Sequence, residues 1–341
     1  MSRARNYLSS LILTLLVVMP ALASDRISAP VSSDSWPEFS YSTSLMTTTV
    51  DFRILLTSSR QSEEIAGKAV KDAISEIERI TQVFSEWEPD SEISAINRAA
   101  GQAPVNVSDE VFRLIAEAVR LSELSRGKFD ITFKSAGQLW DFRARTIPEK
   151  EALQRAVKAI NYRNVVLDNN HKTVFLKEAN TRIGLGGIAK GYAIDRAVQI
   201  IRAAGFELFY INAGGDLYAS SGIRDKRWKV GIQDPDNSDD LVALLPVANA
   251  AVATSGDYER FFEKDGIRYH HIIDPATGEP ARLSRSVTVL TSRAYLADAL
   301  ATAVFVLGPD DGLALIRSLP EAEALIIDST GAIHGTMLTI Q

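Results

Sequence analysis

The order of the apolar segments limits the fold of this chain more than any other feature. Short runs of β-branched and aromatic residues follow one another between residues 165 and 291, and only one long helical pattern interrupts them. A doubly wound parallel sheet needs strands that alternate with helices, so this grouping favours an α+β fold with mainly antiparallel strands. The predicted strands are residues 165–167, 174–176, 208–211, 228–232, 241–245 and 287–291, and Asn169-Asn170 predicts a hairpin turn between the first two.

Helical spacing of apolar residues marks the segments expected to flank the sheet. Ser62 and Ser108 stand at N-cap positions, and Gly127 follows the second helix as a C-terminal signal. A further apolar run at residues 324–327 is predicted to be a core strand. The predicted helices are residues 62–86, 109–126, 187–204, 294–306 and 310–318.

Composition excludes several classes of protein. The chain has 341 residues, of which 46% are apolar and 23% are charged, so it can bury a large core. A net charge of −6 argues against binding to nucleic acid, which requires a basic surface. The absence of cysteine excludes disulfides, cysteine-ligated metal centres and a thiol nucleophile. No linker-like segment follows residue 41, so residues 41–341 are expected to form one large domain.

The N-terminus has the pattern of a cleavable export signal. Arg3 and Arg5 precede an apolar run at residues 11–19, and an Ala-x-Ala site predicts cleavage after Ala23. A membrane anchor is the alternative, but the run is shorter than the ~20 residues that span a bilayer. Residues 24–40 are expected to be an extended lead-in. The mature protein is therefore expected in the periplasm, and without cysteine it is not expected to be a lipoprotein.

The densest motif is the glycine-rich segment at residues 184–192. It contains G-x-G-x-x-A, which is typical of dinucleotide binding when it joins a strand to a helix. That interpretation is the runner-up, because polar residues precede the motif and the next strand ends in Asn212-Ala-Gly-Gly, without an acid for a ribose. A tight turn that opens a helix is another alternative. The chemical alternative is a nest of backbone N–H groups that binds a phosphate, with Lys190 adding positive charge.

Asp298 and Thr302 are one helical turn apart. Their oxygens lie on one face of a predicted helix, among small apolar residues. A carboxylate beside a hydroxyl, without a neighbouring histidine or cysteine, suits a hard cation such as Mg²⁺. The alternative is a helix-end charge and a core threonine that bonds back to its own helix.

The segment at residues 269–278 contains two of the four histidines in the chain. Adjacent residues of a strand point to opposite sides, so only one of His270 and His271 can face a given site. Asp274-Pro275 and Thr277-Gly278 are typical of turns. This segment is therefore either a strand that leads into a turn or the position of a general base or phosphate ligand.

Taken together, these segments resemble the ApbE family, the FAD:protein FMN transferases. The resemblance extends from about residue 41 to the end of the chain, and the matching segments occur in the family's order. They are Met46-Thr-Thr-Thr-Val, Phe84-Ser-Glu-Trp87, Asp90-Ser-Glu-Ile93, Gly127-Lys128-Phe129-Asp130-Ile-Thr132, Leu139-Trp-Asp-Phe142, residues 185–195, Asn212-Ala-Gly-Gly-Asp216, Thr254-Ser-Gly-Asp257, residues 270–278 and residues 297–302.

The resemblance implies a role for individual residues. His271 is implied as the acid/base, with Asp257 as the other candidate base, and Lys190 adds charge at the phosphates. The backbone carbonyl of Gly187, with Asp298 and Thr302, is implied as the Mg²⁺ site. The positions implied to contact flavin or FAD are Met46, Trp87, Lys128, Phe129, Asp130, Lys190 and Ile273.

The resemblance also implies the reaction and its partners. FMN would pass from FAD to a threonine hydroxyl of a target protein, with Mg²⁺ as cofactor and AMP as the leaving group. The implied target is a membrane redox-complex subunit or a flavin-carrying reductase. A periplasmic FAD pyrophosphatase that gives FMN and AMP, and a flavin-binding protein without turnover, remain as alternatives.

Two departures from the family pattern are visible. Gly184 stands where the family usually has aspartate, and residues 135–138 read Ser-Ala-Gly-Gln where the family usually has Pro-Leu. One contact to the flavin is therefore expected to be missing or to be supplied by another residue.

Overall fold

The computed structural model describes residues 36–222, 228–237 and 239–336. The predicted signal at residues 1–23 and most of the lead-in lie outside the described residues. The first strand, β1 (Glu38–Leu45), pairs along its whole length with β2 (Thr48–Leu55), so the folded part begins slightly before the predicted residue 41.

An antiparallel sheet forms the centre of the molecule. Its strand order is β1-β2-β6-β7-β10-β13-β14-β15, and every pairing in it is antiparallel. The α+β prediction is therefore confirmed, and the runner-up dinucleotide-binding unit, which requires parallel neighbours, is wrong. The remaining strands of the sheet are β6 (Leu208–Ala213), β7 (Asp216–Ser221), β10 (Ala250–Gly256), β13 (Ser284–Thr291), β14 (Glu323–Asp328) and β15 (Ile333–Gly335).

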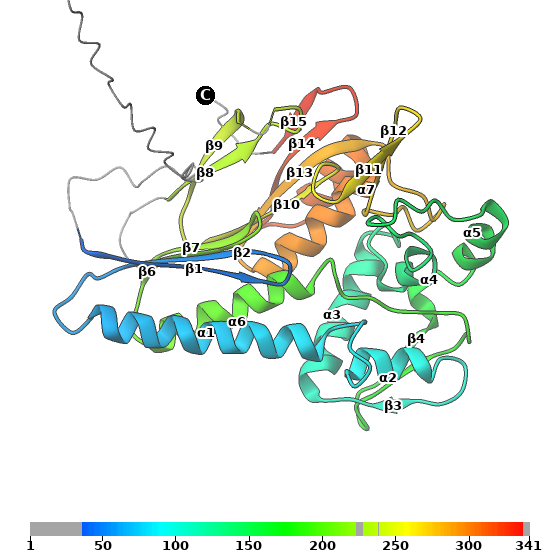
Figure 1. Cartoon of the computed structure of the whole chain (residues 1–341), viewed down its shortest axis with the longest axis horizontal. Helices are drawn as coiled ribbons and strands as arrows, with labels where there is room; N and C mark the ends of the chain where they lie inside the picture. The colour runs from blue at the N-terminus through cyan, green and yellow to red at the C-terminus, as the bar shows by residue number, and fades with distance from the viewer. Residues whose placement is uncertain (1–35, 223–227, 238, 337–341) are drawn as a thin grey trace, which may run out of the picture.

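The two faces of this sheet bury two separate clusters. Along β6, Phe209 and Ile211 join the larger core, while Leu208 and Tyr210 join a second cluster, as the period of two along a strand requires. Helices cover the first face, and a hairpin of β8 (Trp228–Gln233) and β9 (Leu241–Val247) lies over the second (Figure 1). The same strands therefore contribute side chains to both hydrophobic clusters, one on each face of the sheet.

Three long helices pack on the first face. They are α1 (Glu63–Val83), α6 (Ala189–Ala203) and α7 (Ala294–Arg317). The predicted cap is confirmed at α1, where the Ser62 side chain accepts a hydrogen bond from the backbone N–H of Ile65. The two predicted C-terminal helices form α7 with a break at Gly308, whose φ is 76° and which precedes Pro309. α7 is long and apolar enough to cross a membrane, but most of it is buried against the sheet.

A smaller group of elements packs beside this layer, at the lower right of Figure 1. It includes α3 (Asp109–Leu124), which Ser108 caps and after which Gly127 adopts a φ of 80°, as the sequence predicts. The predicted hairpin is β4 (Val165–Asp168) with β5 (Thr173–Leu176). The other elements are α2 (Glu92–Arg98), β3 (Val105–Asn106), the 3₁₀ turns at Ile131–Phe133 and Tyr162–Asn164, α4 (Lys134–Gly137) and α5 (Lys150–Val157). The hairpin of β11 (Phe261–Lys264) and β12 (Ile267–His270) lies above this group, at the upper right of Figure 1.

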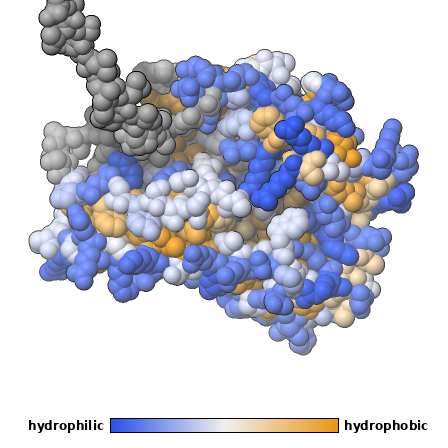
Figure 2. Space-filling view, in the orientation of Figure 1, coloured by the Kyte–Doolittle hydropathy of each residue, from blue (hydrophilic) through white to orange (hydrophobic). Residues whose placement is uncertain are grey.

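The surface seen in Figure 2 is mostly hydrophilic. Apolar residues show through in a band between the β1–β2 hairpin and α1. They mark the seam where the sheet and the helix layer meet, and further apolar residues are visible at the right of the view.

Candidate active site

The start of α6 is held tightly against the start of α7. Gly191 has no side chain because an added Cβ would lie 2.2 Å from the carbonyl oxygen of Ala294. The Asp195 carboxylate accepts hydrogen bonds from the backbone N–H groups of Ala294 and Tyr295, each at 3.0 Å, and thereby caps α7. The close helix crossing brings the first turns of α7 beside the glycine-rich loop.

Lys190 lies between two buried acids. Its ammonium is 2.9 Å from the Oδ2 of Asp216, which is only 2% exposed at the start of β7. Asp298, also buried, accepts a hydrogen bond at 3.0 Å from the backbone N–H of Gly191. One lysine therefore faces two buried carboxylates, and the centre holds more negative than positive charge.

The predicted metal residues come together at this centre. A Cβ on Gly187 would lie 3.3 Å from the Oγ1 of Thr302, so the backbone of the loop approaches the hydroxyl closely. The Oγ of Ser255, near the end of β10, is 3.5 Å from the same hydroxyl. Thr302 therefore lies against the Gly187 backbone, and Asp298, one helical turn before it, contacts the same loop at Gly191, so a carboxylate and neutral oxygens are neighbours here, a donor set that suits a hard cation.

The pKa values follow from the crowding of buried acids. Burial and the charge of Asp216 together raise the pKa of Asp298 to about 7, although Lys190 and the N–H of Gly191 act in the opposite direction. Burial also raises the pKa of Asp216 and of Glu259. Burial alone would lower the pKa of Lys190, but the negative charges of Asp216 and Asp298 raise it overall. This surplus of negative charge favours binding of a cation.

No group of three or more histidine or acidic side chains stands close enough to form a metal cluster in residues 36–222, 228–237 and 239–336. A cation at this centre would therefore be held by one carboxylate, a hydroxyl and a backbone carbonyl. Mg²⁺ fits such a site, because it commonly binds through one or two carboxylates and completes its shell with water and substrate phosphate.

The two histidines have different environments. The Nε2 of His270 is 2.8 Å from the carbonyl oxygen of Ala281 inside the core, which makes it a structural residue. His271 is half-buried, and its Nδ1 is buried without a hydrogen-bond partner in the described part of the chain. Burial lowers the pKa of His271 to about 3, and the charges of Arg260 and Lys190 act in the same direction. His271 is therefore neutral at pH 7, with a ring nitrogen available to accept a proton.

The β1–β2 turn reaches the segment that carries His271. Met46 lies in this turn with a φ of 51°, and the neighbouring Thr47 hydroxyl accepts a hydrogen bond at 2.7 Å from Arg260. The backbone carbonyl of Arg260 in turn accepts the N–H of His271 at 3.1 Å. Hydrogen bonds through Arg260 therefore connect the turn that contains Met46 to His271.

Residues 128–130 have different roles. Phe129 lies against the glycine-rich loop, Lys128 binds the turn after His271, and Asp130 holds its own loop together. Phe129 is buried, and its ring would lie 3.3 Å from a Cβ on Gly187, which places it directly below the loop. The ammonium of Lys128 is 3.0 Å from Asp274, in the turn that follows His271. Both carboxylate oxygens of Asp130 accept internal hydrogen bonds, from Thr132 and from the N–H of Tyr162, so its visible role is to hold this loop.

Three further predicted residues have other surroundings. The indole of Trp87 is 75% exposed. Ile273 is buried among aromatic residues next to α4 and α5. The Asp257 carboxylate is 3.0 Å from Arg268 and 3.4 Å from Arg285, in a hollow that also includes His270. The Asp257 carboxylate therefore binds arginines on the side of His270. His271, in contrast, is near enough to Lys190 for the lysine charge to lower its pKa.

Sequence reasoning did not assign a role to Asp216 or Glu259. Asp216 follows the Asn-Ala-Gly-Gly turn, and an acid there is buried only because β7 enters the sheet directly after it. Lys190 was the signal that could have led to Asp216. A lysine predicted to lie at the packed start of a helix requires an acidic partner.

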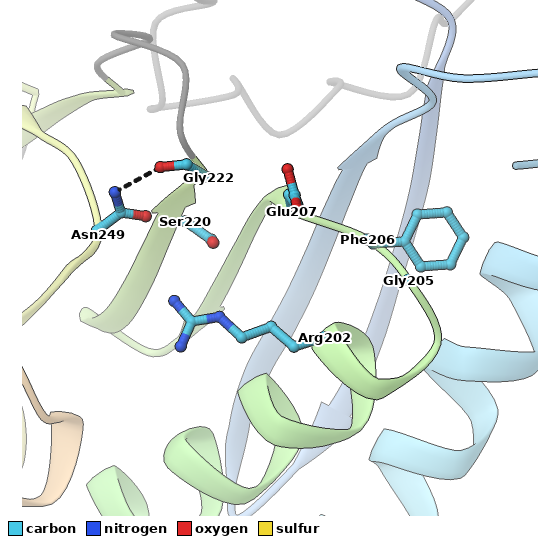
Figure 3. A pocket seen from close by; sticks show the side chains of 7 residues that line it. All are labelled: Arg202, Gly205, Phe206, Glu207, Ser220, Gly222 and Asn249. Atoms are coloured by element: carbon cyan, nitrogen blue, oxygen red, sulfur yellow. Dashed lines mark hydrogen bonds between the residues drawn. The ribbon is translucent and has the colours of Figure 1, made fainter.

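The hollow drawn in Figure 3 lies away from this centre. It has a volume of about 370 Å³, and Arg202, Glu207, Ser220 and Asn249 are among the residues around it. Arg202 belongs to the last turn of α6, whereas Lys190 belongs to the first. The hollow and the charged centre are therefore at opposite ends of one helix.

Comparison with known proteins identifies the family. The sequence profile of the ApbE family matches residues 46–326. A protein of Treponema pallidum named FAD:protein FMN transferase is 36% identical over 293 residues, which cover 81% of each chain. One of the same name from Haemophilus influenzae is 31% identical over 288 residues, again 81% of each chain.

Solved structures agree with this assignment. The ApbE protein from Thermotoga maritima superposes with a TM-score of 0.79 at 34% identity, covering 87% of this chain and 96% of its own. The flavin transferase ApbE from Vibrio cholerae gives 0.78 at 26% identity, with coverage of 88% and 97%. The matched residues include the whole charged centre, and the chain described here belongs to the ApbE family.

Proposed function

We propose that this protein transfers the FMN moiety of FAD to a threonine hydroxyl of a target protein and releases AMP, with Mg²⁺ as cofactor. The observation that carries the proposal is the buried centre of Lys190, Asp216, Asp298 and Thr302 beside the glycine-rich loop, in a chain whose relatives are named FAD:protein FMN transferase. Positive charge, an anionic metal ligand and backbone N–H groups are what a pyrophosphate requires.

The chain's own residues would bind and orient FAD. The N-terminus of α6 carries a partial positive charge, which suits a phosphate. Lys190, whose ammonium pairs with Asp216, would add positive charge near this helix start. Phe129 and Gly187 shape the wall below the loop, and the lack of a side chain at Gly187 lets the phosphates approach the backbone.

Mg²⁺ would be held by Asp298, Thr302 and the carbonyl of Gly187, and when bound it neutralises negative charge on phosphate oxygens. The surplus of buried carboxylate charge described above supports this assignment. No group in this donor set is a soft ligand, so copper and other soft metals are not favoured.

The reaction requires one proton transfer. The threonine oxygen forms a bond to the FMN-side phosphorus, and the bond from that phosphorus to the bridging oxygen breaks, so that AMP leaves with the bridging oxygen. His271, whose Nδ1 has no hydrogen-bond partner in the described part of the chain, would take the hydroxyl proton. Asp257 is the weaker candidate, because two arginines already bind its carboxylate.

Incubation of the protein with FAD and Mg²⁺, with and without a threonine-bearing acceptor, tests the proposal. AMP together with a flavin-labelled acceptor is the expected result. AMP with free FMN, in the presence of acceptor, would show a pyrophosphatase instead. Unchanged FAD in every arm, with flavin still bound to the protein, would show a binding protein without turnover.

We also propose that the protein acts in the periplasm after removal of residues 1–23, and that the acceptor is a subunit of a membrane redox complex or a flavin-carrying reductase. The charged start, the short apolar run and the Ala-x-Ala site of the sequence support export. N-terminal sequencing of the protein from a periplasmic extract should begin at Ser24. A cytoplasmic protein that still begins at Met1 would contradict the proposal.

A further inference from the structure

A second hollow lies beside the strand that leads to His271, on the side of His270. It has a volume of about 280 Å³, and residues of β12, the start of β13 and the β14–β15 turn surround it. Three arginines line this arginine hollow, and Asp257 is the only acid among the described residues around it. The hollow therefore carries an excess of positive charge in a chain whose net charge is −6.

The three arginines share one carboxylate inside the hollow. The Oδ1 of Asp257 is 3.0 Å from Arg268 and its Oδ2 is 3.4 Å from Arg285, so each oxygen serves one guanidinium. Arg282 pairs with no carboxylate in the described part of the chain. It donates a hydrogen bond at 2.5 Å to the backbone carbonyl of Arg268, and it lies 5.6 Å from the centroid of the Tyr269 ring. One guanidinium is thus held in place without an acidic partner.

The other acids that bind these arginines come from outside the hollow. Asp236 is 2.5 Å from Arg285, and Glu263 is 3.2 Å from Arg268. The two acidic side chains are 70% and 58% exposed, so these contacts are surface ion pairs, which individually contribute little. They show where a carboxylate fits on each guanidinium, and an incoming carboxylate can replace them at small cost.

A buried hydroxyl beside the arginines lacks a partner. Ser284 lines the hollow and is only 3% exposed, and its Oγ has no hydrogen-bond partner among the described residues. An unsatisfied buried hydroxyl costs free energy, because it has lost its bonds to water without a replacement. A ligand that accepts a hydrogen bond in this hollow would remove that cost.

A β-bulge directs Arg285 into the same hollow. Ser284 pairs with Asp328 and Ser286 pairs with Ile327, so Arg285 is the extra residue of β13 opposite β14. Neighbouring residues of a regular strand point to opposite sides, yet both Ser284 and Arg285 line the hollow. The irregularity therefore brings a guanidinium and a hydroxyl, two donors, to one place.

We propose that the arginine hollow binds the carboxylate of an acidic side chain on the acceptor protein, which rests on the proposed transfer of FMN to that protein. Arg282, Arg285 and the Ser284 hydroxyl donate hydrogen bonds to the carboxylate. A volume of about 280 Å³ lies below that of pockets that enclose a drug-sized ligand, so it suits a single side chain. His270 and His271 are adjacent, so an acceptor anchored here lies next to the proposed base.

Peptides that contain one threonine test the proposal. In one set of peptides a single aspartate stands at each position on either side of the threonine, and each peptide has an asparagine counterpart. Binding to the purified protein is measured by calorimetry without FAD, at constant ionic strength. At least one aspartate peptide should bind about 5- to 30-fold more tightly than its asparagine counterpart. Equal affinities throughout the set would overturn the proposal.

Arg282→Gln tests where the aspartate is bound. The variant removes a guanidinium that no carboxylate holds, and the preference for aspartate should fall below about twofold. Arg113→Gln removes the same charge from the surface of α3, where Arg113 is 2.5 Å from Asp109, and should keep the preference. Arg282→Glu should instead favour a peptide with lysine at the responsive position. A preference for aspartate that is unchanged in Arg282→Gln would contradict binding in this hollow.

The two unpartnered hydroxyls of β13 form a matched pair of variants. The Oγ1 of Thr291, at the other end of the strand, also lacks a partner among the described residues, but Thr291 does not line the hollow. Ser284→Ala and Thr291→Val should each leave the free energy of unfolding unchanged or higher, because neither loses a hydrogen bond. Only Ser284→Ala should weaken the preference for aspartate, by about threefold or more. Equal preferences in both variants would exclude a contact between Ser284 and the carboxylate.

Inorganic phosphate separates acceptor binding from binding of a free anion. Phosphate that binds the wild type but not Arg282→Gln, in a protein that shows no preference for aspartate peptides, would overturn the role in acceptor binding. Failure of this proposal is distinguishable from failure of the proposed function. A protein that transfers flavin equally well to aspartate and asparagine peptides keeps the function and loses the site. If FAD stays intact in every arm, the proposed function fails, and the affinities measured without FAD still decide whether the hollow binds a carboxylate.

Discussion

The two ends of α6 differ in what they bury. At the first turn, Lys190 faces the buried carboxylates of Asp216 and Asp298, and the charge is not balanced. At the last turn, about 18 Å away at 1.5 Å per residue, Arg202 is exposed and donates a hydrogen bond to the hydroxyl of Tyr218. The second end has the more evident hollow (Figure 3), and the first has the buried charges on which the proposed function rests.

If the proposed function is correct, charge and burial are a better guide to the reacting centre of this protein than open volume. A buried carboxylate without full compensation costs free energy, and a fold retains it only if a ligand or a reaction uses it. The hollow at the end of α6 is lined by exposed or bonded groups, so its presence costs the protein little. Each prediction below tests whether function really resides at the first end alone.

Asp298→Ala should have the largest effect. Loss of the one carboxylate of the proposed metal site should reduce Mg²⁺-dependent FAD turnover at least about 10³-fold. The fold should remain, because the N–H of Gly191 loses one acceptor, worth about 1 kcal/mol, while buried negative charge is relieved. Turnover is measured as AMP release, and stability by urea unfolding.

Thr302→Ser is the matched control for that variant. It keeps a hydroxyl at the same place and should retain turnover within about fivefold. Wild-type turnover and unchanged Mg²⁺ dependence in Asp298→Ala would show that the metal is bound elsewhere.

The dependence of stability on pH should show the unbalanced charge directly. Asp298 has a folded pKa of about 7, above its unfolded value near 4, so the native state binds more protons between these pH values. The free energy of unfolding should therefore fall as pH rises from about 4 to about 7, by up to about 4 kcal/mol, and level off above. The raised pKa values of Asp216 and Glu259 act in the same direction.

Asp298→Asn isolates this contribution from that of the other carboxylates. The measurement is urea unfolding in EDTA between pH 4 and 8, and the difference between wild type and variant should change with pH as described. Added Mg²⁺ should flatten the wild-type curve, because the bound cation lowers the pKa of its ligand. If the curves of stability against pH were parallel for the two proteins, the pKa of Asp298 would not be raised in the folded state.

Patterns of nearby residues in the sequence predicted the helices and strands. They also predicted which residues of one helix lie side by side. The strands, the caps at Ser62 and Ser108, the end at Gly127 and the break in α7 each depend on residues near in sequence, and each is confirmed. Asp298 and Thr302 were predictable for the same reason, since positions i and i+4 share a helix face.

Contacts between distant segments were not predictable from this sequence. Asp216 becomes the partner of Lys190 only when β7 enters the sheet below α6. Gly184 looked like a lost contact, and only the fold brings Glu86 into the same space. Asp130 is the opposite case, because Asp-Ile-Thr has the pattern of a side chain that caps its own turn, and its carboxylate does so.

Gly187→Val should have a moderate effect that falls on ligand binding. A Cβ there would already be 3.3 Å from both the Phe129 ring and the Thr302 hydroxyl, so the branched side chain must displace one of them and intrude on the phosphates. FAD affinity measured by calorimetry should fall about 10-fold or more, with a smaller change in stability. Gly186→Ala is the control, because a Cβ at Gly186 meets nothing within 4 Å. Equal affinities for the two variants would contradict close approach of the phosphates to this backbone.

Arg202→Gln should have the smallest effect. It tests directly whether the last turn of α6 takes part in the reaction. The variant loses a hydrogen bond at 2.8 Å to Tyr218 and the guanidinium contact with its ring at 5.1 Å, at a part-exposed position. Unfolding free energy should therefore decrease by about 1 kcal/mol or less. FAD turnover and affinity should stay within about twofold of the wild type, because no charge of the catalytic centre depends on this residue. If turnover of the acceptor protein instead fell 10-fold while FAD binding was unchanged, the hollow at the end of α6 would be a docking site for the acceptor. The two ends of the helix would then divide the reaction between them, with the charged end holding the nucleotide and the open end holding the protein.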